Sequence, residues 1–219
     1  LQRGVDAVIG AASSGVSLTF IDKVTGAGVI HFSPANTSPA FTTYDDNGLY
    51  FRTAPSDLFQ GAVLAEVAAN DGSTKPAVLA LQDAYGEGLA NAFTSNFTNA
   101  GGSLALDPVI YDPQAASFEA EVGKVAASKP DAVVLIGFEE SKKIVQELIK
   151  QGIGPDKVQL YLVDGNLTNT LGEGLPDGIL EGTKGTLPGA QASDELRAAL
   201  LEVDPALVDL ATRLSPTTP

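Results

Sequence analysis

The chain has 219 residues, enough for one large hydrophobic core or for one complete lobe and part of another. It carries 13 Lys and Arg against 27 Asp and Glu, so a surface for nucleic acid or an anionic membrane is not expected. The sequence has no Cys and one histidine, His31, which excludes disulfides, a Cys nucleophile and thiolate or His-rich metal sites. We therefore expect neither a metal nor a cofactor.

Short apolar runs alternate along the chain with segments of helical spacing. The runs predict strands at residues 5–10, 29–32, 77–81, 103–110, 132–136 and 158–163. A helix is expected from Ser14 to about Val24, and apolar residues that recur every three or four positions predict four more. These residues are Phe59, Val63 and Val67; Leu89, Phe93 and Phe97; Phe118, Val122 and Ala126; and Ile144, Val145, Leu148 and Ile149. Such alternation predicts an α/β fold with parallel sheets flanked by helices.

Two segments mark expected lobe boundaries. Residues 49–55 form an extended stretch that leads to Ser56 and Asp57, a good helix cap, and residues 178–187 are Gly-rich and prone to β-structure. The expected division is residues 1–54 as part of an N-terminal lobe, residues 55–182 as a second α/β lobe, and residues 183–219 as the return crossover with part of the N-terminal lobe. Because the first lobe would be incomplete, its open sheet edge could pair with a second copy of the chain.

Polar loops follow five of the predicted strands. They lie at residues 10–15, 33–39, 83–88, 137–140 and 164–166. Ligands bind at the carboxyl ends of parallel strands, so we expect these loops to converge on one small-molecule site.

The first loop allows three interpretations. Ser13 and Ser14 begin a helix, where hydroxyls and free backbone N–H groups attract an anion, but one of them could simply cap the helix. Ala11, Ser13 and Gly15 also form a relaxed nucleophile elbow, typical of α/β hydrolases. That fold places its catalytic histidine last, whereas His31 comes 18 residues after Ser13 and no histidine follows it. The hydrolase is therefore the least favoured interpretation, and His31 is expected to be a packed residue.

The later loops offer recognition groups without a catalytic set. Tyr85 can supply a flat face and a hydroxyl, and Asp164, at the end of an apolar strand, is a candidate partner for a ligand cation or an ordinary turn residue. Glu139 and Glu140 are neighbours in sequence, and adjacency alone does not make an acid–base pair. We expect a binding protein and not an enzyme.

The order of these motifs resembles the type I periplasmic binding proteins, in particular the branched-chain amino acid (Leu/Ile/Val) substrate-binding proteins of ABC transporters. The motifs are Val8-Ile9-Gly10 with Ser13-Ser14, Ser33-Pro34-Ala35 with Thr37 and Pro39, Phe51-Arg52-Thr53, Asp83-x-Tyr85-Gly86-x-Gly88, Gly137-Phe138 and Asp164-Gly165. The resemblance spans almost the whole chain. It implies a two-lobe fold with an incomplete N-terminal lobe, and a chain that is a central piece of such a protein.

The resemblance also implies a ligand site. Ser14 and Thr37 would hold a ligand carboxylate, and the Ala35 carbonyl would take the ammonium group. Tyr85, Phe138 and the acid Asp164 would come from the second lobe. The full candidate set is Ser13, Ser14, Ala35, Asn36, Thr37, Tyr85, Phe138, Glu139 and Asp164.

Three of these positions depart from the family pattern and leave the preferred ligand side chain open. Asn36 stands where small residues are common, Glu139 follows Phe138 where some members place a Tyr nearby, and residue 164 is Asp instead of Glu.

The function implied is an extracytoplasmic solute receptor, periplasmic or a cell-surface lipoprotein, that delivers an amino acid to a membrane permease. The ligand would be branched-chain or otherwise apolar. The sequence contains no Met, so we expect a signal segment upstream of residue 1. The alternative is a ligand-sensing domain of the same fold in a receptor or regulator.

Overall fold

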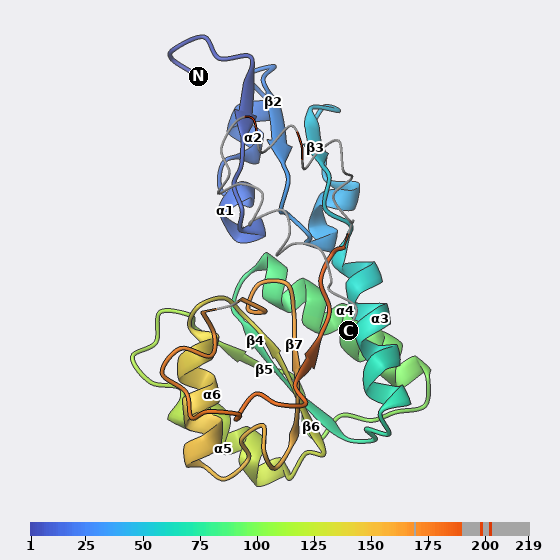
Figure 1. Ribbon diagram of the computed structural model, residues 1–219. Helices are drawn as coiled ribbons and strands as arrows, with labels where there is room; N and C mark the ends of the chain where they lie inside the picture. The colour runs from blue at the N-terminus through green and yellow to red at the C-terminus, as the bar shows by residue number, and fades with distance from the viewer. Residues whose placement is uncertain (169, 190–197, 199–201, 203–219) are drawn as a thin grey trace. The chain divides into compact units, whose positions relative to one another are not determined.

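The computed structural model describes residues 1–168, 170–189, 198 and 202. The chain divides into two compact units, Leu1–Thr186 and Leu187–Pro219. Within the described residues, the first unit contains a three-stranded sheet and a five-stranded sheet, and every strand pair is parallel (Figure 1). The predicted α/β class with parallel sheets is confirmed. The expected division at residues 54 and 182 stays a prediction.

The first sheet has the strand order β1-β2-β3. Its elements are β1 (Ala7–Ile9), α1 (Ser14–Leu18), α2 (Ile21–Thr25), β2 (Ile30–Ser33), the 3₁₀ helix η1 (Pro39–Thr43) and β3 (Tyr50–Arg52). The single helix expected from Ser14 to Val24 is instead two short helices. The Thr19 hydroxyl bonds back to the Val16 carbonyl, and Phe20 leaves the helical conformation and packs its ring 4.8 Å from that of His31.

The second sheet has the order β5-β4-β6-β7-β8. Its elements are α3 (Asp57–Asn70), β4 (Pro76–Leu81), α4 (Ala84–Asn99), β5 (Val109–Tyr111), α5 (Glu119–Ser128), β6 (Ala132–Ile136), α6 (Ser141–Lys150), β7 (Gln159–Leu162) and β8 (Lys184–Gly185). Helices α3 and α4 pack together, as do α5 and α6 (Figure 1). Strand β5 is shorter than the predicted run of residues 103–110, because Pro108 has no N–H to add to a ladder.

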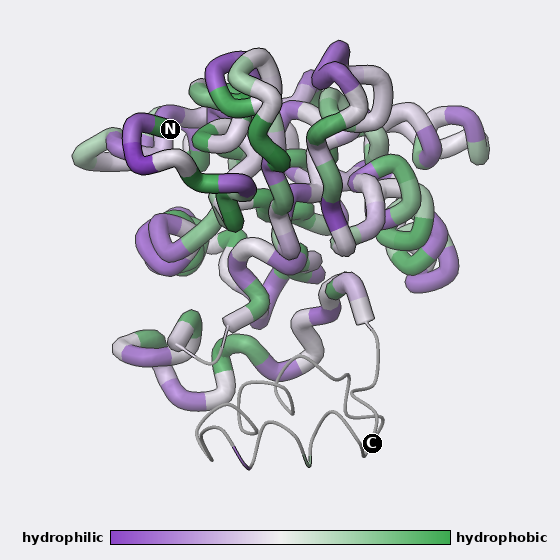
Figure 2. Tube along the Cα trace, turned by 90° about the horizontal axis from the view of Figure 1, so that it is seen from above, coloured by the Kyte–Doolittle hydropathy of each residue, from purple (hydrophilic) through white to green (hydrophobic). Residues whose placement is uncertain are grey.

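The core lies around strands β4 and β6, whose residues are all buried. This fits near-continuous apolar runs, which are typical of parallel strands covered on both faces. Figure 2 shows hydrophobic and hydrophilic segments alternating along the described chain. None of the described helices is long and apolar enough to cross a membrane.

Helix α3 was predicted correctly as a helix, but of its apolar repeat only Val67 packs against the core. Phe59 is 70% exposed and Val63 is 50% exposed. The buried face consists of Asp57, Gln60, Gly61, Leu64, Ala65 and Ala68. A Cβ at Gly61 would lie 2.6 Å from the Ala92 Cβ, so small residues let α3 approach α4 closely. Close packing of the two helices therefore decides which face is buried.

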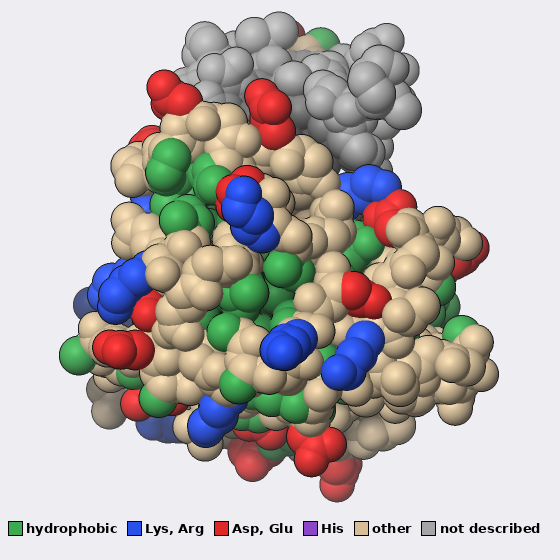
Figure 3. All heavy atoms as spheres, turned by 90° about the horizontal axis from the view of Figure 1, so that it is seen from below, with side chains coloured by type: hydrophobic (Ala, Val, Ile, Leu, Met, Phe, Trp, Pro, Cys, Tyr) green, Lys and Arg blue, Asp and Glu red, His purple; other side chains and the backbone are tan. Residues whose placement is uncertain are grey.

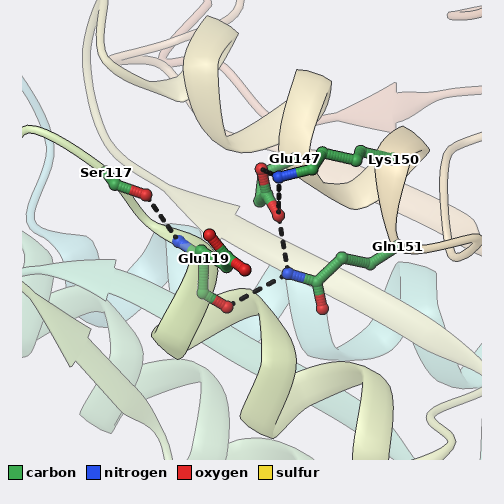
Figure 4. Close-up of polar contacts among 5 residues, drawn as sticks. All are labelled: Ser117, Glu119, Glu147, Lys150 and Gln151. Carbon is green, nitrogen blue, oxygen red and sulfur yellow. Dashed lines mark hydrogen bonds and ion pairs between the residues drawn. The ribbon is translucent and has the colours of Figure 1, made fainter.

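A side-chain hydrogen bond joins the start of α5 to the end of α6 (Figure 4). The Gln151 amide donates to the Glu119 carbonyl at 3.0 Å and to the Glu147 carboxylate at 2.7 Å. Lys150 pairs with Glu147 at 3.2 Å on the surface, where such pairs contribute little to the free energy of unfolding.

On the face shown in Figure 3, acidic and basic side chains of the described residues are mixed with apolar ones.

Candidate functional site

The loop after β1 brings Ser13 and Ser14 to the start of α1. The Ser13 hydroxyl accepts from the Val16 N–H at 3.3 Å and donates to the Asp83 carboxylate at 3.4 Å. Ser14 is buried, and its hydroxyl oxygen accepts from the Ser38 N–H at 3.2 Å. The Ser14 oxygen is therefore held in place while its proton can be donated to another group.

Asn36 fixes this loop from the neighbouring one. Its side chain is fully buried, and its amide nitrogen donates to the carbonyls of Ala11 at 3.0 Å and Ala12 at 2.9 Å. Its amide oxygen accepts from the Tyr50 hydroxyl at 3.0 Å. Both N–H donors of the Asn36 amide are thus engaged inside the protein. The Ser33 hydroxyl adds a third hydrogen bond to this loop by donating to the Ala11 carbonyl at 2.7 Å.

His31 is packed and is not paired with Ser13. It is fully buried, with its ring 4.8 Å from that of Phe20 and 5.1 Å from that of Tyr50. Its Nε2 forms a 2.6 Å hydrogen bond with the Gly10 carbonyl. In the described part of the chain, the Ser13 hydroxyl bonds to Asp83 and not to histidine, so the arrangement gives no support to a hydrolase.

The loop after β2 reaches both α3 and α4. Thr37 is buried, and its backbone carbonyl accepts from the Asp57 N–H at 2.8 Å. The Ser38 hydroxyl donates to the Ala84 carbonyl at 2.7 Å. Ala35 is exposed, and its N–H donates to Ser33. The loop that follows the first sheet's middle strand is therefore bonded to the first residues of two helices of the second sheet.

Three predicted residues meet at the second sheet. The Tyr85 hydroxyl donates to the Asp164 carboxylate at 2.7 Å, and the Tyr85 ring stacks on Phe138 with centroids 5.2 Å apart. Burial raises the pKa of Asp164, opposed by its hydrogen bonds from Tyr85 and Gln60. Burial and the charge of Asp164 raise the pKa of Tyr85, which keeps the hydroxyl a donor. Glu139 is exposed, away from these bonds.

Two residues that the sequence reasoning missed complete this cluster. The Gln60 amide nitrogen donates to Asp164 at 3.0 Å and to the Thr186 carbonyl at 3.0 Å. Asp57 is fully buried at the first position of α3, and neither of its carboxylate oxygens has a hydrogen-bond donor among the described residues. The sequence suggested only a helix cap at Asp57. The signal was the spacing of Asp57 and Gln60, which places both on one helix face.

The environment of Asp57 disfavours its charged form. Burial is the largest cause, and the negative charge of Asp164 adds to it, so the pKa of Asp57 rises from 3.8 to about 8. The nearby Thr37 hydroxyl and the Arg52 guanidinium oppose this shift, although the Thr37 hydroxyl does not meet hydrogen-bond geometry with either carboxylate oxygen. Two neighbouring carboxyl groups can hold a cation. Within the described residues, no cluster of three or more His, Asp or Glu side chains could bind a metal ion.

Comparison with known proteins gives the class. The family described as periplasmic binding protein matches residues 1–200, so the chain belongs to this family, and the type I assignment made from the motifs is confirmed. A Leu/Ile/Val-binding protein homolog 2 of Brucella abortus is 30% identical over 187 residues, covering 84% of this chain and 48% of its own length.

Two solved structures share the fold. The leucine-binding protein LivK of Thermotoga maritima has a TM-score of 0.78 and 26% identity over 92% of this chain and 57% of its own. The branched-chain amino acid substrate-binding protein LivJ of Streptococcus pneumoniae, in complex with isoleucine, has a TM-score of 0.63 and 26% identity over 75% of this chain and 45% of its own. The chain thus spans about half the length of these relatives.

Proposed function

We propose that the chain is the ligand-binding part of an extracytoplasmic receptor that takes up an amino acid and delivers it to the membrane permease of an ABC transporter. The ligand is branched-chain or otherwise apolar. The relatives support this proposal, because they include a leucine-binding protein and a branched-chain amino acid transporter protein in complex with isoleucine. In this family the receptor acts outside the cytoplasm, in the periplasm or at the cell surface.

The observation that carries the amino-acid assignment is the pair of neighbouring acids, the fully buried Asp57 and the half-buried Asp164. A buried charge without a partner is costly, and a ligand cation would compensate for it. An ammonium group supplies a positive charge and three N–H donors. On the buried face of α3, both Asp57 oxygens and the Gln60 amide oxygen are acceptors without a donor among the described residues. A plain carboxylate would instead add negative charge to these acids.

The other end of the ligand is assigned to the loops of the first sheet. Ser14 and Thr37 are buried hydroxyl residues in the loops after β1 and β2. The Ser14 proton is directed away from the Ser38 N–H, to which its oxygen is already bonded. Two such hydrogen bonds to a charged carboxylate contribute roughly 1.5–3 kcal/mol each. The ligand's side chain would then lie near the stacked rings of Tyr85 and Phe138.

Substitution of Asp164 tests the amino-acid assignment. Loss of one partner of a buried ion pair costs roughly 3–5 kcal/mol. Asp164→Asn should therefore weaken leucine binding by about 100-fold or more in calorimetric titration, and weaken binding of 4-methylpentanoate, the same acid without its amine, far less. Asp107→Asn, at an exposed acid, is the matched control. Equal losses for the two ligands would show that Asp164 does not hold an ammonium group.

A further inference from the structure

We propose that ligand uptake is coupled to the release of a proton from Asp57. This inference rests on the proposed function, because it requires a ligand with a cationic group. It goes beyond recognition of the ligand, since it makes the protonation of the empty site part of the binding equilibrium.

The geometry around Asp57 favours a neutral carboxyl group in the empty site. The side chain is 0% exposed, and in the described residues no donor reaches either carboxylate oxygen. A buried carboxylate without donors is strongly destabilised relative to the protonated acid. One helical turn along the same face, Gln60 directs its N–H groups to Asp164 and Thr186 and not to Asp57.

The charged groups and the hydroxyl that face Asp57 come from four other parts of the fold. Asp164 follows β7, Asp83 caps α4, Arg52 ends β3, and Thr37 lies in the loop after β2. The two acids raise the pKa of Asp57. Arg52 opposes them, but its guanidinium donates to the Ser38 carbonyl at 2.7 Å and to Thr42 at 2.9 Å. With burial as the largest cause, the pKa of Asp57 is about 8, so the group is protonated at pH 7.

A ligand ammonium group reverses this balance. It brings a full positive charge and N–H donors to a carboxyl group whose oxygens accept no hydrogen bond within the described residues, while the guanidinium of Arg52 donates to Ser38 and Thr42 instead. The ammonium group therefore favours the ionised form of Asp57. The neutral Asp57 carboxyl loses its proton to the solvent, and the resulting carboxylate pairs with the ammonium. Charge is conserved, since the positive charge brought by the ligand is matched by the proton released.

Calorimetric titration of leucine at pH 7 in two buffers of different ionisation enthalpy measures the proton directly. With a pKa of about 8 in the empty site, the protein should release more than half a proton per leucine bound. Asp57→Asn, which cannot titrate, should bind leucine more weakly and release about none, while the exposed control Asp107→Asn should release as much as the unaltered protein.

A second readout does not depend on any variant. In the unaltered protein, leucine affinity should rise up to about tenfold per pH unit between pH 6 and 8, and level off above that. Leucine binding with no proton exchange and no pH dependence would overturn the proton coupling and leave the amino-acid assignment intact. Equal proton release from Asp57→Asn would also overturn it. Failure to bind leucine or any other amino acid would overturn the proposed function itself.

Discussion

Asp57→Asn should stabilise the empty protein relative to the unaltered one as the pH rises from 5 to 8, although it removes a residue of the proposed site. The substitution keeps the size of the side chain and removes the titrating group. Asp57 is fully buried, and its pKa is raised from 3.8 to about 8 by burial and by Asp164. Ionising it in the folded protein is therefore unfavourable, whereas in the unfolded chain it ionises freely.

The direction of the pH effect on stability follows from proton linkage. Between pH 4 and 8 the folded state holds a proton on Asp57 that the unfolded chain has lost, so the free energy of unfolding falls as pH rises. One pKa unit corresponds to about 1.36 kcal/mol, so three pH units, from 5 to 8, correspond to about 4 kcal/mol. Relaxation and water entry would reduce this figure, and about 2–4 kcal/mol is the expected range.

The assay is urea denaturation of ligand-free protein, followed by circular dichroism at pH 5 and at pH 8. The difference in unfolding free energy between Asp57→Asn and the unaltered protein should grow by about 2–4 kcal/mol in favour of the variant from pH 5 to pH 8. Groups shared by both proteins largely cancel in this difference. A difference that does not change with pH would show that Asp57 is not protonated in the empty site.

Three further sets of substitutions test other parts of the account. Ser14→Ala and Thr37→Ala should each weaken leucine binding by about tenfold or more in titration, because each removes a hydroxyl assigned to the carboxylate; unchanged affinity in both would place the carboxylate elsewhere. Asn36→Ala should lower the free energy of unfolding by about 1–3 kcal/mol in urea titration, since the Tyr50 hydroxyl loses its acceptor and the Ala12 carbonyl loses its donor, and a change near zero would show that Asn36 does not fix this loop. Gly61→Ala should lower the melting temperature because its Cβ would meet the neighbouring helix at 2.6 Å, whereas Gly123→Ala, with its nearest contact at 3.6 Å, should raise it slightly; the reverse order would refute the close packing of α3.

The sequence was most informative where burial is continuous. The runs that became β4 and β6 are apolar throughout, as strands covered on both faces must be, and they gave the α/β class. Residues directly after the strands could be selected as candidates because parallel strands end at one edge of their sheet. In this way Tyr85, Phe138 and Asp164 were singled out, and the structure brings them into contact.

The buried face of α3 could not be predicted from spacing. Phe59 and Val63 make the better apolar repeat, yet the helix buries the side that carries Gly61. The reason is tertiary, since only small residues allow the close approach of α4. Because this face of the helix is the buried one, Asp57 and Gln60 are buried too, although such polar side chains are usually exposed to solvent. Asp57 was therefore not predicted as a site residue, because its position directly after Ser56 fits an ordinary helix cap.

The central claim is that the site recognises an ammonium group. The most direct test is calorimetric titration of the unaltered protein with leucine and with 4-methylpentanoate, two ligands that differ only in the amine. The fully buried Asp57 and the half-buried Asp164 predict that leucine binds at least about 100-fold more tightly, from the roughly 3–5 kcal/mol of a buried charge pair. Equal or tighter binding of 4-methylpentanoate would contradict the claim.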